Sequence, residues 1–591
     1  MPDLTLSTTH STPVPPTVKR PAGSRWSWAF LIDIAVFLFV GAAIFGLYAI
    51  SRSWLGPVHP HVVISQDPGV LPLYALYSLV RIGLAYAFSL VFALAYGYVA
   101  ASSRRAEIIM VPLLDILQSI PVLSFLPGVM LAMVAIFPHS QLGAELGSIL
   151  LIFTGQVWNI AFSFYSSLKT VPRELHEAAV IYRFSRWQRF AELDLPFSTI
   201  GLVWNSMMSV AGGWFFLMAC EMFVLGNRDF RLPGLGSFLQ TAASHGDTHA
   251  ILCGVAAMIA VIVLLDQLVW RPIIVWADKF KFEQAESSGA AQSTLLQLIG
   301  RASVILRLYR LIVQPVFNWL TLTFTLGARR AAETFSAPKP PRLRRWAGYL
   351  LAAGILIGLG FAVFHAAREL SGLHREDYIE LLQSAVLTFL RVNTALILGA
   401  LWTVPVGVAI GSHPRLARIA QPLAQMAASI PATALFPIIL LFLLRLRGGL
   451  EIAAMLLMLL GTQWYILFNV IAGAVAIPTD LKQAAQIYRF SSWDRWRYLL
   501  LPGIFPYLVT GLVTASGGAW NASIVAEYFH FQGRIVSTAG LGSTISSASD
   551  AGRFDVLLAS TLIMATVVVL LNRLLWRRLY RLASSRFKLE A

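Results

Sequence analysis

Long blocks of apolar residues are the feature that most restricts how this chain can fold. The block at 28–50 reads WAFLIDIAVFLFVGAAIFGLYAI, and the block at 557–576 reads LLASTLIMATVVVLLNRLLW. A helix of roughly 18 or more apolar residues can cross the hydrocarbon core of a bilayer, where every backbone polar group must be paired internally. Of the 591 residues, 57% are hydrophobic and 13% are charged, about half the charged share of soluble domains. The chain is therefore predicted to be an all-α polytopic membrane protein.

About twelve membrane spans are predicted, six in each half of the chain. They are placed near 28–50, 72–101, 109–136, 147–168, 197–225 and 249–271, and near 347–367, 379–411, 419–444, 450–475, 503–527 and 555–576. Lys and Arg concentrate in alternate loops and in the C-terminal tail, as the positive-inside rule describes for cytoplasmic segments. This pattern accounts for the net charge of +16 without nucleic-acid binding, and it predicts that both termini are cytoplasmic.

The predicted organisation is two membrane domains joined by a basic linker. The segments are a disordered cytoplasmic tail at 1–27, a first repeat at 28–275 (core about 75–275), a linker at 276–345, a second repeat at 346–578 (core about 383–578) and a tail at 579–591. Within the linker, 308–328 is apolar but interrupted by Arg310, Gln314 and Pro315. One more crossing there would invert the second half, so this segment is predicted to lie on the membrane surface as an amphipathic piece.

The two halves of the chain repeat one another. EAAVIYRFSRWQRFAELDLP at 177–196 matches QAAQIYRFSSWDRWRYLLLP at 483–502, and the offset of 306 (177 to 483) continues without gaps for about seventy residues. Upstream the offset is 310 (119 to 429), where SIP at 119–121 matches SIP at 429–431. Six spans per half is an even number, so both copies enter the membrane in the same direction. The halves are predicted to be parallel repeats with a solute path between them.

The repeated charged segment is predicted to protrude into the cytoplasm as a short helix, a break at RFSRW, and a second short helix. Its small residues permit close approach of another protein, and its aromatic and arginine side chains are the types enriched at interfaces. The candidate contact residues are Glu177, Ala178, Ala179, Tyr182, Arg183, Phe184 and Trp187, with Gln483, Ala484, Ala485, Tyr488, Arg489, Phe490 and Trp493. The alternative interpretation is an interfacial helix with Trp and Arg at the lipid head groups, repeated only because the domain was duplicated.

The order of motifs resembles the permeases of binding-protein-dependent ABC importers, in the nitrate, sulfonate and taurine branch. The motifs are SLVR (78–81) and FLR (389–391), SIP followed by FLP or LFP, the EAA loop, and AGGW…CEMF or GGAW…AEYF followed by GLG. The resemblance implies two fused type I transmembrane domains in a bacterial inner membrane. It also implies that each loop docks into a cytoplasmic ATP-binding subunit, that these two subunits form a homodimer, and that an external solute-binding protein delivers a small, mostly anionic solute.

Two positions depart from the family pattern. The family usually has Gly seven positions into the EAA motif, where this chain has Arg183 and Arg489, and the second copy begins with Gln483 in place of Glu. Because both copies share YRFS, the departures imply a matched, specialised ATPase partner. The chain contains no Gly-Lys pair and hence no phosphate-binding GxxxxGK[ST] loop. ATP hydrolysis is therefore expected on separate chains, and neither a cofactor nor a metal site is predicted.

Candidate path residues lie at repeated positions inside the spans. They are Glu221 and Glu527, Gly212 and Gly518, and Pro121 and Pro431. Buried carboxylates in spans are functional hypotheses by default, so the two glutamates are candidates for a gate; the alternative is a hydrogen bond at a helix end to the partner half. The repeated prolines of SIP and of FLP or LFP are expected to kink or break the third and ninth spans and to line the path. For Arg81 and Arg391 the alternatives are to attract an anion, to cap a neighbouring helix end, or to snorkel toward the head groups.

Two other functions are compatible with a polytopic chain. A secondary transporter also uses parallel repeats, but it requires coupling carboxylates near the midplane, where Asp115 is the main candidate, and it has no need of a docking loop. A membrane-embedded enzyme requires a catalytic cluster, and no such motif stands out in the sequence. The repeated loop therefore favours a transport subunit driven by partner ATPases.

Overall fold

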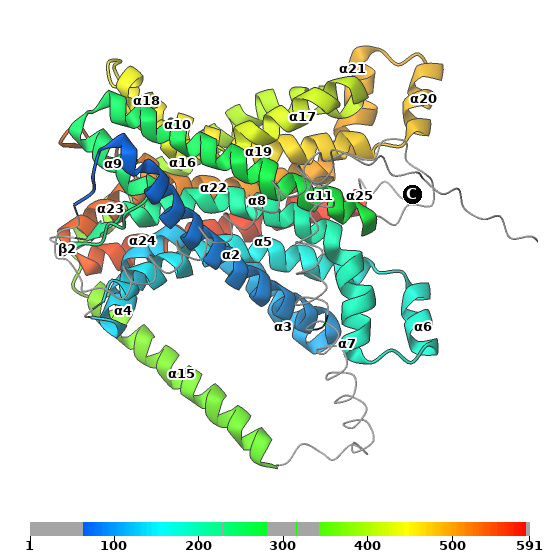
Figure 1. The fold of residues 1–591 in the computed structure, drawn as a ribbon, viewed down its shortest axis with the longest axis horizontal. Helices are drawn as coiled ribbons and strands as arrows, with labels where there is room; N and C mark the ends of the chain where they lie inside the picture. The colour runs from blue at the N-terminus through cyan, green and yellow to red at the C-terminus, as the bar shows by residue number, and fades with distance from the viewer. Residues whose placement is uncertain (1–62, 139, 226–227, 281–314, 316–341, 587–591) are drawn as a thin grey trace, which may run out of the picture.

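The computed structural model describes residues 63–138, 140–225, 228–280, 315 and 342–586, and these are almost entirely helical. The predicted span at 28–50 lies outside the described residues, as does all but one residue of the segment predicted to lie on the membrane surface, 308–328. Within the described parts, one order of elements occurs twice (Figure 1).

The first repeat begins with a single long helix and ends with a bent one. Its helices are α2 (Leu71–Ser102), α3 (Arg104–Ser119), α4 (Leu126–Ile136), α5 (Leu142–Thr170), α6 (Arg173–Ile181), α7 (Arg186–Arg189), α8 (Leu195–Glu221), α9 (Leu235–His245), α10 (Thr248–Leu265) and α11 (Arg271–Ala277). Short 3₁₀ segments are η1 (Pro68–Val70), η2 (Val122–Phe125) and η5 (Asp278–Phe280), and π-helical segments are η3 (Phe190–Asp194) and η4 (Asp266–Trp270). A hairpin of β1 (Val224–Leu225) and β2 (Arg228–Asp229) precedes α9.

The second repeat follows the same order after an additional helix, α15 (Arg342–Leu370). Its elements are α16 (Arg375–Ser412), α17 (Pro414–Ser429), α18 (Ala432–Leu443), α19 (Gly449–Ala476), α20 (Thr479–Ile487), α21 (Ser492–Asp494), η7 (Arg495–Leu500), α22 (Leu501–Ala526), β3 (Tyr528–Phe531), β4 (Arg534–Ser537), α23 (Leu541–Ala551), α24 (Phe554–Leu571), η8 (Asn572–Trp576) and α25 (Arg577–Arg586). Helices α6 and α20 begin 306 residues apart (173 and 479), as do α9 and α23 (235 and 541). The offset found in the sequence is therefore also the offset of the structure.

Eight helices in the described part of the chain are long and apolar enough to cross a membrane. They are Pro68–Ser102, Leu142–Thr170, Arg186–Glu221, Thr248–Ala277, Arg375–Ser412, Gly449–Ala476, Ser492–Ala526 and Phe554–Ala583. Each agrees with a predicted span. The polytopic all-α class is thereby confirmed, four single-helix spans falling in each repeat.

The predicted third and ninth spans are broken at the repeated prolines. Helices α17 and α18 meet at an angle of 80°, and Pro431 between them is extended, with φ −67° and ψ 129°. In the first repeat α3 ends at Ser119, and Pro121 is extended in the same way before η2. Proline has no N–H to donate and disfavours helical geometry in the residue before it. The break expected from the sequence is therefore present at the SIP proline of both copies, whereas Pro127 and Pro437 of FLP and LFP lie within α4 and α18.

The repeats lie side by side and point the same way. In Figure 1 the small helices α6 and α7 and their counterparts α20 and α21 project at one end of the molecule, whereas α9 and α23 lie at the other. This arrangement is that of parallel repeats. The hairpins were not expected from the sequence, because strands of two to four residues are too short to produce a readable alternation. The helices α9 and α23 were not predicted either.

Candidate functional site

The projecting helices α6 and α20 carry apolar side chains that face away from the protein. Tyr182 is 75% exposed and Tyr488 is 77% exposed, and Ile181 and Ile487 beside them are equally open. Clustered exposed apolar groups of this kind mark interaction surfaces. The two tips are equivalent, one on each repeat, at the same end of the molecule (Figure 1).

The other residues predicted for these loops divide into an outer and an inner set. Glu177 and Gln483 are exposed, as is Trp493, whereas Trp187 and the aromatic pair Phe184 and Phe490 are half-buried. Ala178 and Ala484 are also half-buried. Ala179 and Ala485, expected to admit another protein, are buried inside their own loop, at 6% and 4% exposed. Their small size therefore serves the packing of the loop helix within its own loop.

Arg183 and Arg489 occupy a backbone conformation that favours glycine. Their φ angles are 53° and 52°, in the left-handed region that costs a non-glycine residue about 1 kcal/mol or more. Each follows the cap of its helix in a Schellman motif. The N–H of Phe184 donates to Ala179 at 2.9 Å and that of Arg183 to Val180 at 3.0 Å, and the second copy repeats both bonds. Glycine, which the resemblance leads us to expect at this position, adopts this conformation without strain. The two arginines adopt it despite the strain.

A buried ionic network ties four helices of the first repeat together at the end opposite the loops. Arg81 on α2 is 1% exposed; its Nε and Nη2 donate to Glu145 on α5 at 2.6 and 2.7 Å. Its Nη1 donates to Glu221, at the end of α8, at 2.7 Å. Glu221 also accepts from Ser78 Oγ and from the N–H of Gly236 on α9, both at 2.7 Å.

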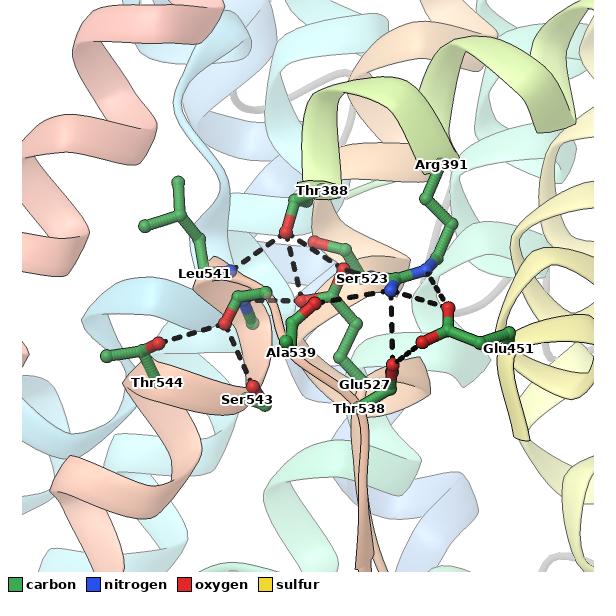
Figure 2. A network of polar contacts seen from close by, with 12 residues as sticks. Thr388, Arg391, Glu451, Ser523, Glu527, Thr538, Ala539, Leu541, Ser543 and Thr544 are labelled. Atoms are coloured by element: carbon green, nitrogen blue, oxygen red, sulfur yellow. Dashed lines mark hydrogen bonds and ion pairs between the residues drawn. The ribbon is translucent and has the colours of Figure 1, made fainter. Parts of the chain in front are cut away.

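The second repeat contains the same network at equivalent positions (Figure 2). Arg391 on α16 donates to Glu451 on α19 through Nε at 3.0 Å and Nη2 at 2.6 Å, and its Nη1 pairs with Glu527. Glu527 also accepts from Thr388 Oγ1 at 2.9 Å and from the N–H of Gly542 at 2.8 Å. Duplication has thus preserved one arginine, two carboxylates, a hydroxyl and a helix N-terminus in each half.

The two networks differ in their contact with solvent. The Glu145 side chain is 2% exposed, whereas that of Glu451 is 49% exposed. Thr538, which also bonds Glu451, stands where the first copy has Leu232. The first network is therefore sealed, and the second is partly solvated.

Glu221 and Glu527, the predicted gate candidates, are fully buried within their own repeats. Their bonds are at helix ends, as the alternative interpretation predicted, but the partners belong to the same repeat and not to the other half. Arg81 and Arg391 likewise pair with carboxylates, and Arg81 Nη1 also caps the carbonyl of Pro233 at 2.8 Å. The sequence analysis did not identify Glu145 and Glu451, although the offset of 306 maps one onto the other.

The GLG motifs are explained by this network. Gly234 and Gly540 lie so close to the carboxylates of Glu221 and Glu527 that a Cβ on either would collide with them. We expect Gly234→Ala to destabilise the protein by about 1–3 kcal/mol, because a well-packed site cannot absorb an added methyl group. The measurement is thermal unfolding of the purified chain.

The matched control is Gly83→Ala on α2, where a Cβ meets nothing within 4 Å. Since alanine is the better helix former, this variant is expected to be as stable as the parent or slightly more stable. Equal melting temperatures for the two variants would contradict the steric account of the motif.

Two cavities lie where the repeats meet. One, of about 120 Å³, lies among α8, α17 to α19 and α22; the other, of about 170 Å³, lies among α3, α5, α8 and α22. Both are lined by Gly212, Phe216, Tyr465, Gly518 and Asn521. The predicted path residues Gly212 and Gly518 thus come together from opposite repeats.

Of the remaining path candidates, the prolines lie at these cavities and the glutamates do not. Pro431 lines the first cavity, and Pro121 immediately precedes Val122, which lines the second. Glu221 and Glu527 are not among the residues that line either cavity. Asp266, which the sequence analysis did not single out, lines the first. Asn521 also joins the halves directly, because its Oδ1 accepts from the N–H of Leu123 at 3.3 Å.

A third cavity, of about 430 Å³, lies at the end opposite the loops. Its polar lining includes Arg231, Gln240, Tyr528, His530 and Asp550, drawn from both repeats. The Tyr528 hydroxyl donates to Asp550 at 2.6 Å, and burial together with this carboxylate raises the pKa of Tyr528. This third cavity is therefore mostly apolar, with polar groups from both repeats, and lies at one end of the line along which the repeats meet.

Comparison with known proteins places both halves in one family. The family described as "Binding-protein-dependent transport system inner membrane component" matches residues 90–269 and 403–588. The chain is similar to the taurine transport system permease protein TauC of Escherichia coli (strain K12), 29% identical over 192 residues, which are 32% of this chain and 66% of that protein. It is also similar to the nitrate import permease protein NrtB of Leptolyngbya laminosa, 27% identical over 184 residues, 31% of this chain and 62% of that protein.

A third relative is the bicarbonate transport system permease protein CmpB of Synechocystis sp., 27% identical over 183 residues, 31% of this chain and 62% of that protein. The chain thus spans about two thirds of the length of these relatives. The two family matches together cover more than half of the chain. The protein therefore belongs to the family of binding-protein-dependent transport system inner membrane components, with two copies of the family domain in one chain.

Proposed function

We propose that this chain is a membrane-spanning permease of an ATP-driven importer, with two permease domains fused. The observation that carries the proposal is the pair of equivalent projecting loops, each with an exposed apolar tip, at the same end of two parallel family domains. Each loop docks one of two ATP-binding subunits, which form a homodimer. The loops and both termini face the cytoplasm of a bacterial cell, across its inner membrane.

The solute path runs between the repeats. It enters at the third cavity, near Arg231 and His530, where an external solute-binding protein delivers its cargo, and passes the cavities shared by Gly212 and Gly518. These two cavities are small, which is consistent with a path that is closed in this conformation. The ionic networks keep the outer ends of four helices in each repeat together, so that each repeat moves as one body when its loop is displaced.

The solute is a small, mostly anionic molecule. This part of the proposal rests on the named relatives, which are permeases for taurine, nitrate and bicarbonate. The third cavity is compatible with it, because Arg231 and His530 offer donors to an anion, although Asp229 bonds Arg231 at 2.6 Å and Asp550 lies 3.7 Å from His530.

Uptake by the intact complex tests this function. The tagged chain is purified from its own membranes with its associated subunits and reconstituted in proteoliposomes, and uptake of labelled taurine, nitrate and bicarbonate is measured. ATP is expected to drive uptake of one of them, whereas uptake driven by a proton or sodium gradient without ATP would favour the secondary-transporter alternative.

Filling the path is expected to stop this uptake. A leucine at Gly212 or Gly518 places its side chain against Tyr465, within 3.5 Å of the Cβ position in both cases, and occupies cavities of only about 120 and 170 Å³. We expect Gly212→Leu with Gly518→Leu to lower the uptake rate at least about tenfold while ATPase subunits still co-purify. Gly83→Leu, on an exposed face of α2, is the control and should transport normally; normal uptake by the double variant would place the path elsewhere.

A further inference from the structure

A fourth cavity, of about 760 Å³, lies beside the first loop. It is enclosed by the ends of α2 and α5, by the loop helices α6 and α7, and by η3. Its charged lining consists of Lys169, Arg173, His176, Arg186, Arg189 and Asp194. Its volume lies within the range of cavities that hold small organic ligands, about 300–1,000 Å³.

The charges around this cavity do not balance. Lys169 pairs with Glu107 at 2.8 Å, and Arg189 lies 3.7 Å from Asp194. Arg173 and Arg186 have no carboxylate partner among the described residues, which leaves an excess of two positive charges at the cavity.

Histidine in the same wall is held neutral. Burial, and next the charge of Arg189, lowers the pKa of His176, so this ring adds hydrogen-bonding capacity but no further charge. The bonds that Glu107 accepts from Lys169 and Tyr165 lower the pKa of that carboxyl. The Glu107 carboxylate therefore stays charged and offsets the positive charge of Lys169. The unbalanced charge is therefore that of the two arginines.

The second repeat does not carry this set. At an offset of 306, Lys169, Arg173 and Arg186 are replaced by Val475, Thr479 and Ser492, whereas Arg189 is kept as Arg495 and His176 is replaced by Lys482. The second loop has the same fold and the same orientation in the membrane. Neither the loop structure nor the positive-inside rule therefore requires these cations, and their convergence on one cavity points to a ligand.

We propose that this cavity binds a phosphate group, as a lipid head group or as a free phosphate. Arginine presents a planar fork of donors that matches phosphate oxygens, and basic pockets between membrane helices bind phospholipid head groups. Val99, Leu168 and Val171 form an apolar wall of the same cavity, suited to the less polar part of a lipid. The site goes beyond the transport function proposed above, since it requires neither the ATPase contact nor the solute. An occupant would rest against α6 and α7, which makes the first loop, and not the second, responsive to it.

The test compares two double variants of the purified full chain. Arg173→Gln with Arg186→Gln removes the unpaired charges, and Arg415→Gln with Arg418→Gln removes two exposed charges from α17 of the other repeat. In the lipid arm, native mass spectrometry counts phosphatidylglycerol and phosphatidylcholine retained from mixed nanodiscs. In the soluble arm, equilibrium dialysis measures binding of labelled inorganic phosphate to lipid-depleted protein in detergent. Gel filtration establishes that each variant is monodisperse.

In the arm that contains the natural ligand, the Arg173→Gln, Arg186→Gln variant (the cavity variant) is expected to bind about tenfold more weakly than the parent, because charge-assisted bonds to two arginines are lost. The α17 variant is expected to bind within about twofold of the parent, because its charges lie outside the cavity. A difference confined to phosphatidylglycerol identifies a lipid head group, and one confined to inorganic phosphate a soluble ligand. Equal binding by the parent and the cavity variant in both arms, or equal losses in the two double variants, would overturn the site. Neither result bears on ATP-driven uptake, so the two proposals fail separately.

Discussion

Replacing both Arg183 and Arg489 by glutamate is expected to release the ATP-binding subunits and to stop transport. Both arginines are exposed at the loops, and both are kept in a left-handed conformation with φ near 53°. Strain of this kind is characteristic of functional positions. We infer that each guanidinium pairs with a carboxylate of the docked subunit. Reversing the charge costs about 2–5 kcal/mol at such a contact, which weakens docking by roughly 30-fold or more.

Arg183→Gly with Arg489→Gly is the matched control. Glycine adopts the left-handed conformation without cost, so the loop keeps its Schellman bonds and only the guanidinium is lost. We expect this variant to dock more weakly than the parent and more strongly than the glutamate variant. Docking is measured as binding of the purified ATP-binding subunit to the chain in nanodiscs, and a Lys in place of the partner carboxylate should restore the glutamate variant. Normal docking and uptake by the glutamate variant would instead favour the lipid head-group interpretation of these loops.

Removing Arg81 is expected to destabilise the first repeat far more than removing Arg391 destabilises the second. Arg81→Met leaves Glu145 and Glu221, which are 2% and 0% exposed, facing one another without a counter-charge. Breaking a buried ionic group in this way costs about 3–5 kcal/mol. Arg391→Met leaves Glu527 buried, but Glu451 is 49% exposed and remains solvated. Thermal unfolding of the two variants in the same detergent measures the difference.

Replacing the carboxylates as well distinguishes an electrostatic effect from loss of packing. Arg81→Met combined with Glu145→Gln and Glu221→Gln removes every charge of the network, and it is expected to recover most of the lost stability. If the triple variant melts no higher than Arg81→Met, the packing of the arginine stem, and not its charge, holds the four helices together. If Arg81→Met and Arg391→Met melt at the same temperature, the difference in burial has no energetic consequence.

The arrangement of the chain along the membrane was determined by the sequence. Apolar blocks have few stable solutions in a bilayer, because each unpaired backbone group there is costly; the eight long helices therefore fall where hydropathy places them. The breaks at Pro121 and Pro431 also follow from local chemistry, since proline has no N–H to donate. The duplicated loops were recognisable because the offset of 306 relates their residue types one by one.

Other features were decided only by the tertiary structure. Glu145 lies 64 positions from Arg81, and Glu221 lies 140; nothing local connects them, and only the packing of α2 against α5 and α8 shows that they neutralise one another. The same holds for the basic cavity, because Arg173 and Arg186 read as ordinary loop cations until the fold places them around one space. Residue types and their spacing predict the local backbone conformation and the depth of a segment in the membrane, because both depend on residues that are close in the sequence. The partner of a buried charge depends on which helices meet, and that is set by the packing of the whole domain.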